Sequence, residues 1–151
     1  MAKSKQWLSP KMFFDKPKVA KAMDAATKRA LSEMGAFIRR TARTSIRKSK
    51  KTSLPGKPPR SHSGLLKKGI MFSYDAARKS VIIGPELIPS ARRARPDTTV
   101  PNVLEYGGGV TFMRRKRVKR VRIAPRPFMR PAMQKEFRIN FEKRWKNVLD
   151  R

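Results

Sequence analysis

The sequence of 151 residues predicts an α+β fold, in which a long N-terminal helix and a C-terminal helix pack on one face of a small, three- or four-stranded, mainly antiparallel sheet. Two observations predict the helices: apolar residues recur at helical spacing over 18–47, and they do so again after Pro131. A third observation predicts the sheet: short runs of β-branched and aromatic residues, bounded by turn residues, lie between the two helical segments. The length fits a single domain.

The first 17 residues are predicted to form an arm without a regular element, because Pro10 and Pro17 interrupt a stretch of lysines and large apolar residues. Those apolar residues either dock on a partner or pack on the chain's own domain, and the sequence favours both alternatives equally. The candidate interface residues of the arm are Trp7, Phe13 and Phe14. The rest of the chain, 18–151, is predicted to be one α+β domain with basic loops at 48–60, 85–101 and 114–122.

The helix predicted over 18–47 carries its apolar residues, from Val19 to Ile46, on one broad face. It would be about 45 Å long, whereas a compact domain of this size has a radius of gyration of about 15 Å. Either the helix bends at Gly35 or one of its ends projects beyond the core. We favour projection, with the projecting end packed on a neighbouring subunit.

The loop at 48–60 contains the helix breakers Pro55-Gly56 and Pro58-Pro59, and Leu54 is its only large apolar residue. We therefore expect this loop to be mobile. Its basic residues are either solvated or clamp a phosphate backbone. The candidates for contact with DNA or with an acidic partner are Lys50, Lys51, Lys57 and Arg60.

Two strands, around 69–74 and 80–84, are predicted to be antiparallel because a short polar turn joins them. The segment 85–101 contains four prolines and is predicted to be irregular. One helical turn at 102–106, ended by Gly107, should follow it.

A third strand is predicted at 110–113. It leads into 114–122, where seven of nine residues are basic and a hairpin tip should continue into a fourth strand. The further candidates for contact with DNA or an acidic partner are Arg114, Arg115, Lys116, Arg117, Lys119 and Arg120.

The segment 124–133 forms an elbow, because its three prolines cannot lie inside a helix or a central strand. Pro131 suits the first turn of a helix. The apolar positions predicted for that last helix are Met133, Phe137, Phe141, Trp145 and Val148. We expect Phe128 to anchor the elbow in the core, beside Phe137.

Glu105, Arg126 and Phe128 are the candidates from the domain itself for a subunit or partner interface. Two roles are open for Glu105. It forms either a surface ion pair, worth less than about 1 kcal/mol, or a partly buried pair with Arg126 that fixes the elbow.

The chain has 39 Lys and Arg against 10 Asp and Glu, a net charge of +29, which exceeds what solubility requires. Such an excess indicates a polyanionic partner. Nucleic acid is the first candidate, an acidic protein surface the second, and anionic lipid a poor third. We expect contact with a nucleic-acid backbone rather than readout of its sequence, since most aromatic residues have core spacing.

No catalytic, cofactor or metal site and no small-molecule substrate is expected. The sequence has no cysteine, His62 is its only histidine, and its carboxylates are scattered. It also has no apolar run suited to a signal peptide or to crossing a bilayer, so we expect no membrane partner.

Four short motifs follow one another along the chain. They are Ser63-Gly64-Leu65-Leu66, Val81-Ile82-Ile83-Gly84, Leu104-Glu105-Tyr106-Gly107 and Arg126-Pro127-Phe128-Met129-Arg130-Pro131-Ala132. In this order they resemble the neck, or tail-completion, proteins of long-tailed double-stranded-DNA bacteriophages. The resemblance covers Val19 to Leu149.

The resemblance implies a virion structural protein that forms a six-fold or twelve-fold ring of identical subunits between head connector and tail, assembled in the cytoplasm of the host bacterium. The implied partners are the neighbouring connector and tail proteins and the end of the packaged DNA. A tail-terminator or head-closure ring is the alternative within phages. Outside phages, the alternative is a basic protein of the ribosome or nucleoid.

Overall fold

The computed structural model describes residues 16–86, 99–114 and 117–149, and its fold class is α+β, as predicted. The helices in these residues are α1 (Lys16–Ser45), α2 (Leu65–Lys68), α3 (Val100–Tyr106) and α4 (Met129–Leu149). The strands are β1 (Arg47–Lys48), β2 (Arg60–Ser61), β3 (Ile70–Asp75), β4 (Ser80–Pro85), β5 (Gly108–Arg114) and β6 (Arg117–Ile123). Most of the predicted arm and most of the loop at 85–101 lie outside the described residues.

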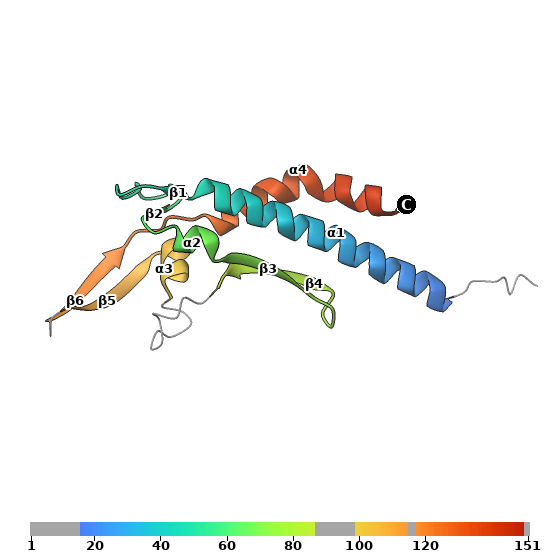
Figure 1. Ribbon diagram of the computed structural model, residues 1–151, viewed down its shortest axis with the longest axis horizontal. Coiled ribbons are helices and arrows are strands. Elements are labelled where there is room, and N and C mark those ends of the chain that lie inside the picture. The colour runs from blue at the N-terminus through green and yellow to red at the C-terminus, as the bar shows by residue number, and fades with distance from the viewer. Residues whose placement is uncertain (1–15, 87–98, 115–116, 150–151) are drawn as a thin grey trace, which may run out of the picture.

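The strands pair two by two instead of forming one larger sheet. Strands β3 and β4 form one antiparallel hairpin and β5 and β6 another, while β1 and β2 make a short parallel pair. Within the described part of the chain, each sheet therefore has two strands. The two hairpins point in different directions from the centre of the molecule, which is why their edges do not join (Figure 1).

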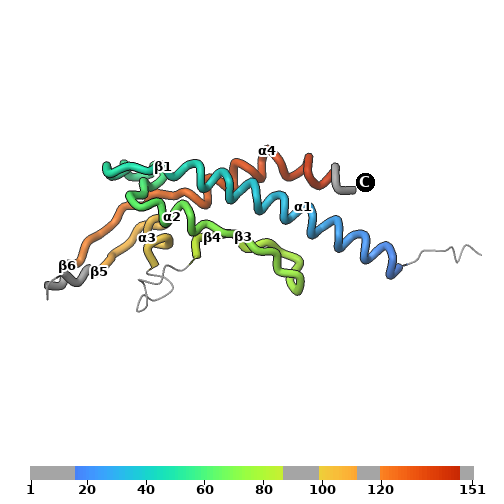
Figure 2. The backbone as a smooth tube through the Cα atoms, in the orientation of Figure 1, coloured from blue at the N-terminus to red at the C-terminus, as the bar shows by residue number. Residues whose placement is uncertain are grey.

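Helix α1 lies between α4 and the hairpin β3–β4, so the two long helices do not share one face of a sheet (Figures 1 and 2). The hairpin approaches α1 closely at Gly35. A β-carbon at that position would lie 2.8 Å from Val81 Cγ2 and 2.9 Å from Phe72 Cδ2. Gly35 thus provides room for the hairpin. Helix α1 continues through Gly35 without interruption.

The N-terminal end of α1 projects, as we favoured from its length. Residues 16–25 are all exposed, including the apolar Val19 and Met23, and the buried positions of α1 begin at Ala30. In Figure 1 this end extends beyond both α4 and the hairpin β3–β4. More than a turn of apolar surface therefore has no cover from the chain's own described residues.

The core lies at the opposite end of α1, where α1, α2, β3 and α4 meet. Its largest fully buried side chains are Phe128, Ile46 and Ile70, and Phe128 is only 1% exposed. The buried cluster consists of Ala42, Ile46, Leu66, Ile70, Phe128 and Ala132. The prediction that Phe128 anchors the elbow in the core is confirmed.

The prediction that Phe137 lies beside Phe128 is wrong, because Phe137 is 51% exposed on α4. The face of α4 towards α1 is mainly small or polar instead. Thr41 donates a hydrogen bond to the buried Glu136, which also accepts one from Asn140. Arg144 pairs with Glu33 at 3.2 Å further along.

Candidate functional site

The carboxylate of Glu105 joins α3 to the start of α4. Its Oε2 accepts hydrogen bonds from the backbone N–H groups of Phe128 (2.9 Å) and Met129 (3.0 Å), and its Oε1 accepts one from Arg130 (2.8 Å). Glu105 is 8% exposed. Its side chain lies at the N-terminal, positive end of the α4 dipole, where acidic side chains stabilise a helix.

This one side chain completes the N-terminus of α4. The first four N–H groups of a helix have no acceptor within the helix. Here Glu105 accepts from the residue before α4 and from its first two residues, and the third residue, Pro131, has no N–H. An acid distant in sequence and a proline together satisfy the whole helix end.

Gly107 lets the elbow approach α3. Its φ of 78° and ψ of 175° lie in a region that is essentially restricted to glycine. A β-carbon there would lie 3.1 Å from the Ile123 carbonyl oxygen and 3.1 Å from Pro125 Cδ. The motif Glu105-Tyr106-Gly107 therefore supplies both the cap of α4 and the space for the elbow.

Arg126 binds the basic loop, not Glu105, so the predicted pair between these two residues is wrong. Its Nε donates to the Ser53 carbonyl oxygen (3.0 Å), and its Nη1 donates to that of Ala124 (3.2 Å). The Gly56 N–H also donates to the Pro125 carbonyl oxygen at 2.9 Å. The loop at 48–60, which we expected to be mobile, is held by the elbow.

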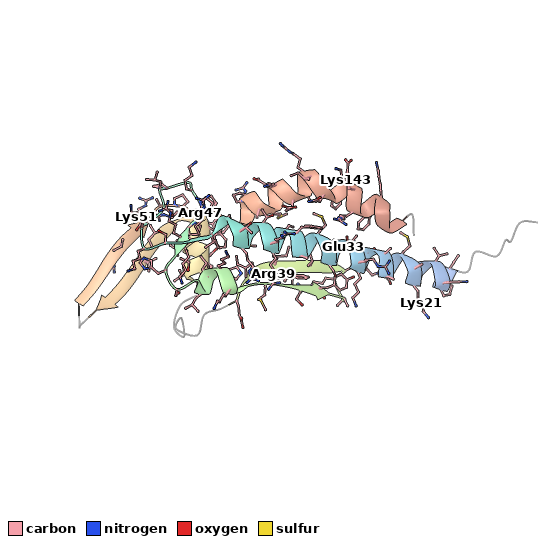
Figure 3. The ribbon with its side chains drawn as sticks, turned by 45° about the horizontal axis from the view of Figure 1, so that its top comes forward. Lys21, Glu33, Arg39, Arg47, Lys51 and Lys143 are labelled. Carbon is pink, nitrogen blue, oxygen red and sulfur yellow. The ribbon has the colours of Figure 1, made fainter. Side chains whose placement is uncertain are left out.

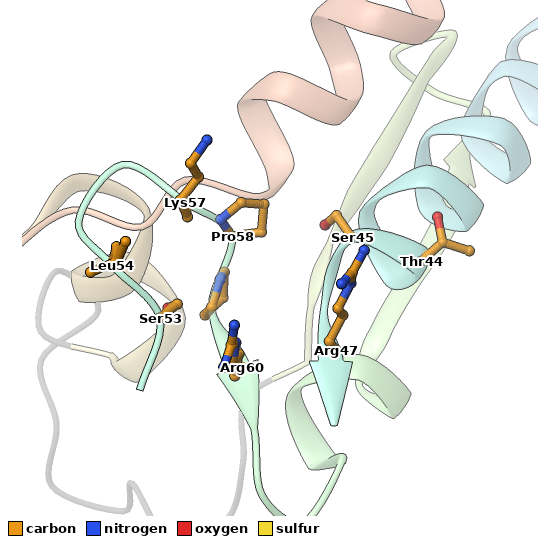
Figure 4. Close-up of a pocket in the computed structure, with 9 residues that line it drawn as sticks. Thr44, Ser45, Arg47, Ser53, Leu54, Lys57, Pro58 and Arg60 are labelled. Carbon is orange, nitrogen blue, oxygen red and sulfur yellow. The ribbon is translucent and has the colours of Figure 1, made fainter. Parts of the chain in front are cut away.

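A basic pocket of about 460 Å³ lies between the end of α1 and this loop (Figure 4). It is lined by Thr44, Ser45, Arg47, Ser53, Leu54, Lys57, Pro58, Pro59 and Arg60. Three lining residues are cations and none is an acid. The pocket contains Lys57 and Arg60, two predicted contact residues, and adds Arg47 and Ser53, which the sequence analysis missed.

The other predicted basic residues lie elsewhere on the molecule. Lys50 and Lys51 are exposed on the same loop, and Figure 3 places Lys51 near Arg47, at the end of the molecule opposite Lys21. Arg114, Arg117, Lys119 and Arg120 belong to the hairpin β5–β6. Arg115 and Lys116 lie outside the described residues.

The hairpin β5–β6 projects away from the helices (Figure 1). Its Arg120 and Arg122 are exposed and pair in register with the small residues Thr111 and Gly109. In an antiparallel pair, residues directly opposite each other lie on the same face. One face of the hairpin therefore presents arginines beside small side chains.

An aromatic face lies on the exposed side of α4. Phe137 stacks on Phe141 with ring centroids 4.3 Å apart, and Met133, one turn before, is 56% exposed. These three residues line a shallow groove with Gln134, Arg138 and Glu142. The predicted interface residues Glu105 and Phe128, in contrast, are buried within the chain's own domain. Trp7, Phe13 and Phe14 lie outside the described residues.

Among the residues that the structure describes, no group of three or more His, Asp and Glu side chains is arranged to hold a metal ion. In the same part of the chain, none of the helices combines the length and the apolar character that a membrane span needs.

Comparison of the chain with protein-family models, curated proteins and solved structures finds no match.

Proposed function

We propose that this chain is a structural subunit of the phage neck, which forms a ring with copies of itself and joins or completes the tail at the head–tail connector. The observation that carries the proposal is the set of three hydrogen bonds from Glu105 to Phe128, Met129 and Arg130. These bonds connect two of the four motifs behind the resemblance to neck proteins. The two motifs therefore form one structural unit, which we call the joint at Glu105: the Glu105 carboxylate and the three N–H groups that it binds. Their contact makes a chance match of short sequences a poorer explanation.

Two apolar surfaces support assembly with other copies. The projecting end of α1 exposes Val19 and Met23, and the aromatic face of α4 exposes Met133 and Phe137. They are different surfaces of one chain, and contacts between different surfaces of identical subunits generate a ring when the rotation from one subunit to the next closes. We propose that a neighbouring copy covers them.

The charge supports a place near DNA or acidic proteins. A ring would multiply the net charge of +29 by its number of subunits, and self-repulsion of that size requires anionic neighbours. The end of the packaged DNA and the connector and tail proteins of the virion would supply them. The residues proposed to contact them are those of the loop at 48–60 and of the hairpin β5–β6.

Electron microscopy of lysates from a phage that lacks the protein tests this proposal. Heads should fill with DNA and tails should polymerise, but the two should not join stably. A variant without residues 1–15 should fold, because α1 begins at Lys16, and should join poorly if the arm docks on a neighbour. Normal infectious virions without the protein would contradict the proposal, and heads empty of DNA would move its role to packaging.

A basic protein of the ribosome or nucleoid is the second candidate, favoured by the projecting hairpin β5–β6 with its exposed Arg120 and Arg122. Rotationally averaged images of the purified assembly distinguish the candidates. A closed ring supports the neck, whereas a monomer that sediments with ribosomes or the nucleoid supports the second candidate.

A further inference from the structure

The basic pocket beside the elbow is lined by three cations and by no acidic residue. Arg47, Lys57 and Arg60 are exposed, and within the described part of the chain none of them forms an ion pair with a carboxylate. Ion pairs do form elsewhere in this very basic chain, for example between Arg144 and Glu33. In the described residues, the acids that form ion pairs are Asp24, Glu33 and Asp75, none of which lines this pocket.

The backbone holds two of these cations beside each other. Arg47 and Arg60 are partners in the parallel pair of β1 and β2. Like charges on directly paired strand residues destabilise the pairing. An anion between them would remove this repulsion.

Ser53 adds an unused hydrogen-bond donor. It is 7% exposed, lines the pocket, and its Oγ has no hydrogen-bond partner among the described residues. A buried polar atom without a partner costs free energy, so native structures contain few of them. A ligand with acceptor oxygens would supply the missing partner.

The backbone of the pocket is already in place. Arg126 fixes the Ser53 carbonyl, Pro125 fixes the Gly56 N–H, and the Lys57 N–H donates to the Leu54 carbonyl at 3.2 Å. Only side chains need to move when a ligand enters, so little ordering cost opposes binding.

We propose that this pocket binds a phosphate group, with Ser53 Oγ–H donating to a phosphate oxygen and Lys57 and Arg60 supplying the charge. Arg47 contributes as well, but it also stands next to the C-terminal end of α1, where a cation offsets the helix dipole. The phosphate belongs either to a nucleic-acid backbone or to a free phosphate ion. This site lies within one chain, so it does not depend on assembly into a ring.

Two variants and a matched control test the site. Lys57→Gln with Arg60→Gln removes two pocket charges, and Ser53→Ala removes the hydroxyl without changing the charge. Lys21→Gln with Lys143→Gln is the control, because both residues are exposed on helices away from the pocket (Figure 3). Calorimetric titration at low salt, with thermal unfolding in parallel, compares inorganic phosphate, a short random-sequence duplex and polyglutamate.

The double pocket variant should lose about tenfold or more in affinity for the ligand, and Ser53→Ala several-fold with an unchanged or higher melting temperature. The control should lose about twofold or less. Pocket-dependent binding of the duplex identifies the nucleic-acid backbone as the source, and binding of inorganic phosphate alone identifies the free ion. Equal losses in pocket and control variants, an unchanged affinity of Ser53→Ala, or binding of polyglutamate alone would overturn the proposal.

Discussion

The joint at Glu105 and the basic pocket are neighbouring regions that differ in whether their polar groups are paired. At the joint, a buried carboxylate accepts three backbone N–H groups and leaves none of them unpaired. In the pocket, two cations are held side by side and a buried hydroxyl has no partner among the described residues. Arg126 and Pro125 connect the two regions through the backbone of the loop at 48–60.

This difference distinguishes a region that stabilises the fold from a region that binds a ligand. Native structures pair nearly all their buried polar groups, so the joint has the form expected of a part that stabilises the fold. Unpaired groups beside it reduce stability unless something outside the chain completes them. We therefore expect substitutions at the joint to change stability, and substitutions in the pocket to change binding.

The largest effect is expected for Glu105→Ala. It leaves three N–H groups at the start of α4 without an acceptor, and we expect a loss of about 4 kcal/mol or more in the free energy of unfolding. Glu142→Ala, which removes an exposed acid from the same helix, is the control and should change stability little. Denaturant titration measures both, and equal losses would show that the joint does not stabilise the fold.

Phe128→Ala should cost about 3–5 kcal/mol, because it opens a cavity in the core next to the joint. Phe137→Ala removes the same ring from a half-exposed position and should cost about 1 kcal/mol or less. If the neck proposal holds, Phe137→Ala should instead weaken assembly. A thermal midpoint of Phe128→Ala equal to that of the wild type would contradict the burial of Phe128.

Gly107→Ala should cost about 1–3 kcal/mol, because alanine strains the backbone at this φ and ψ and crowds the elbow. Gly109→Ala is the matched control, since a β-carbon there would meet nothing within 4 Å. If Gly107 is needed for the joint, thermal unfolding should show a lower melting temperature for Gly107→Ala than for Gly109→Ala.

The smallest effect, and of opposite sign, is expected for Lys57→Gln with Arg60→Gln. Removing the repulsion between Arg60 and Arg47 should leave stability unchanged or raise it by up to about 1 kcal/mol at low salt. A clear loss of stability in urea would show that the pocket cations belong to the fold.

The sequence predicted the elements whose signal is local. The predicted strands at 69–74 and 80–84 agree with β3 and β4 within one residue, and the prediction that Pro131 lies in the first turn of the last helix is confirmed. The projection of α1 also followed from a local quantity, its length. Breakers and periodicity act over a few residues, so one sequence suffices to detect them.

What the sequence did not predict depends on contacts between distant segments. Nothing next to Glu105 indicates that its carboxylate caps a helix that begins 24 residues later. Helical periodicity places Phe137 and Phe141 on one face of α4. It cannot tell that α1 packs instead on the neighbouring face of α4, which carries Glu136 and Asn140. The pocket was missed for the same reason, since Ser53 and Arg47 line one pocket only because the elbow positions the loop.

The separation of folding from binding is tested most directly by backbone amide NMR spectra recorded during titration with inorganic phosphate and then with a short duplex. The account predicts that the amide signals of Ser53, Lys57 and Arg60 shift with the ligand. The signals of Phe128, Met129 and Arg130 should stay in place and exchange slowly with solvent, because Glu105 binds these N–H groups. Rapid exchange at those three amides, or ligand shifts that leave the loop untouched, would contradict it.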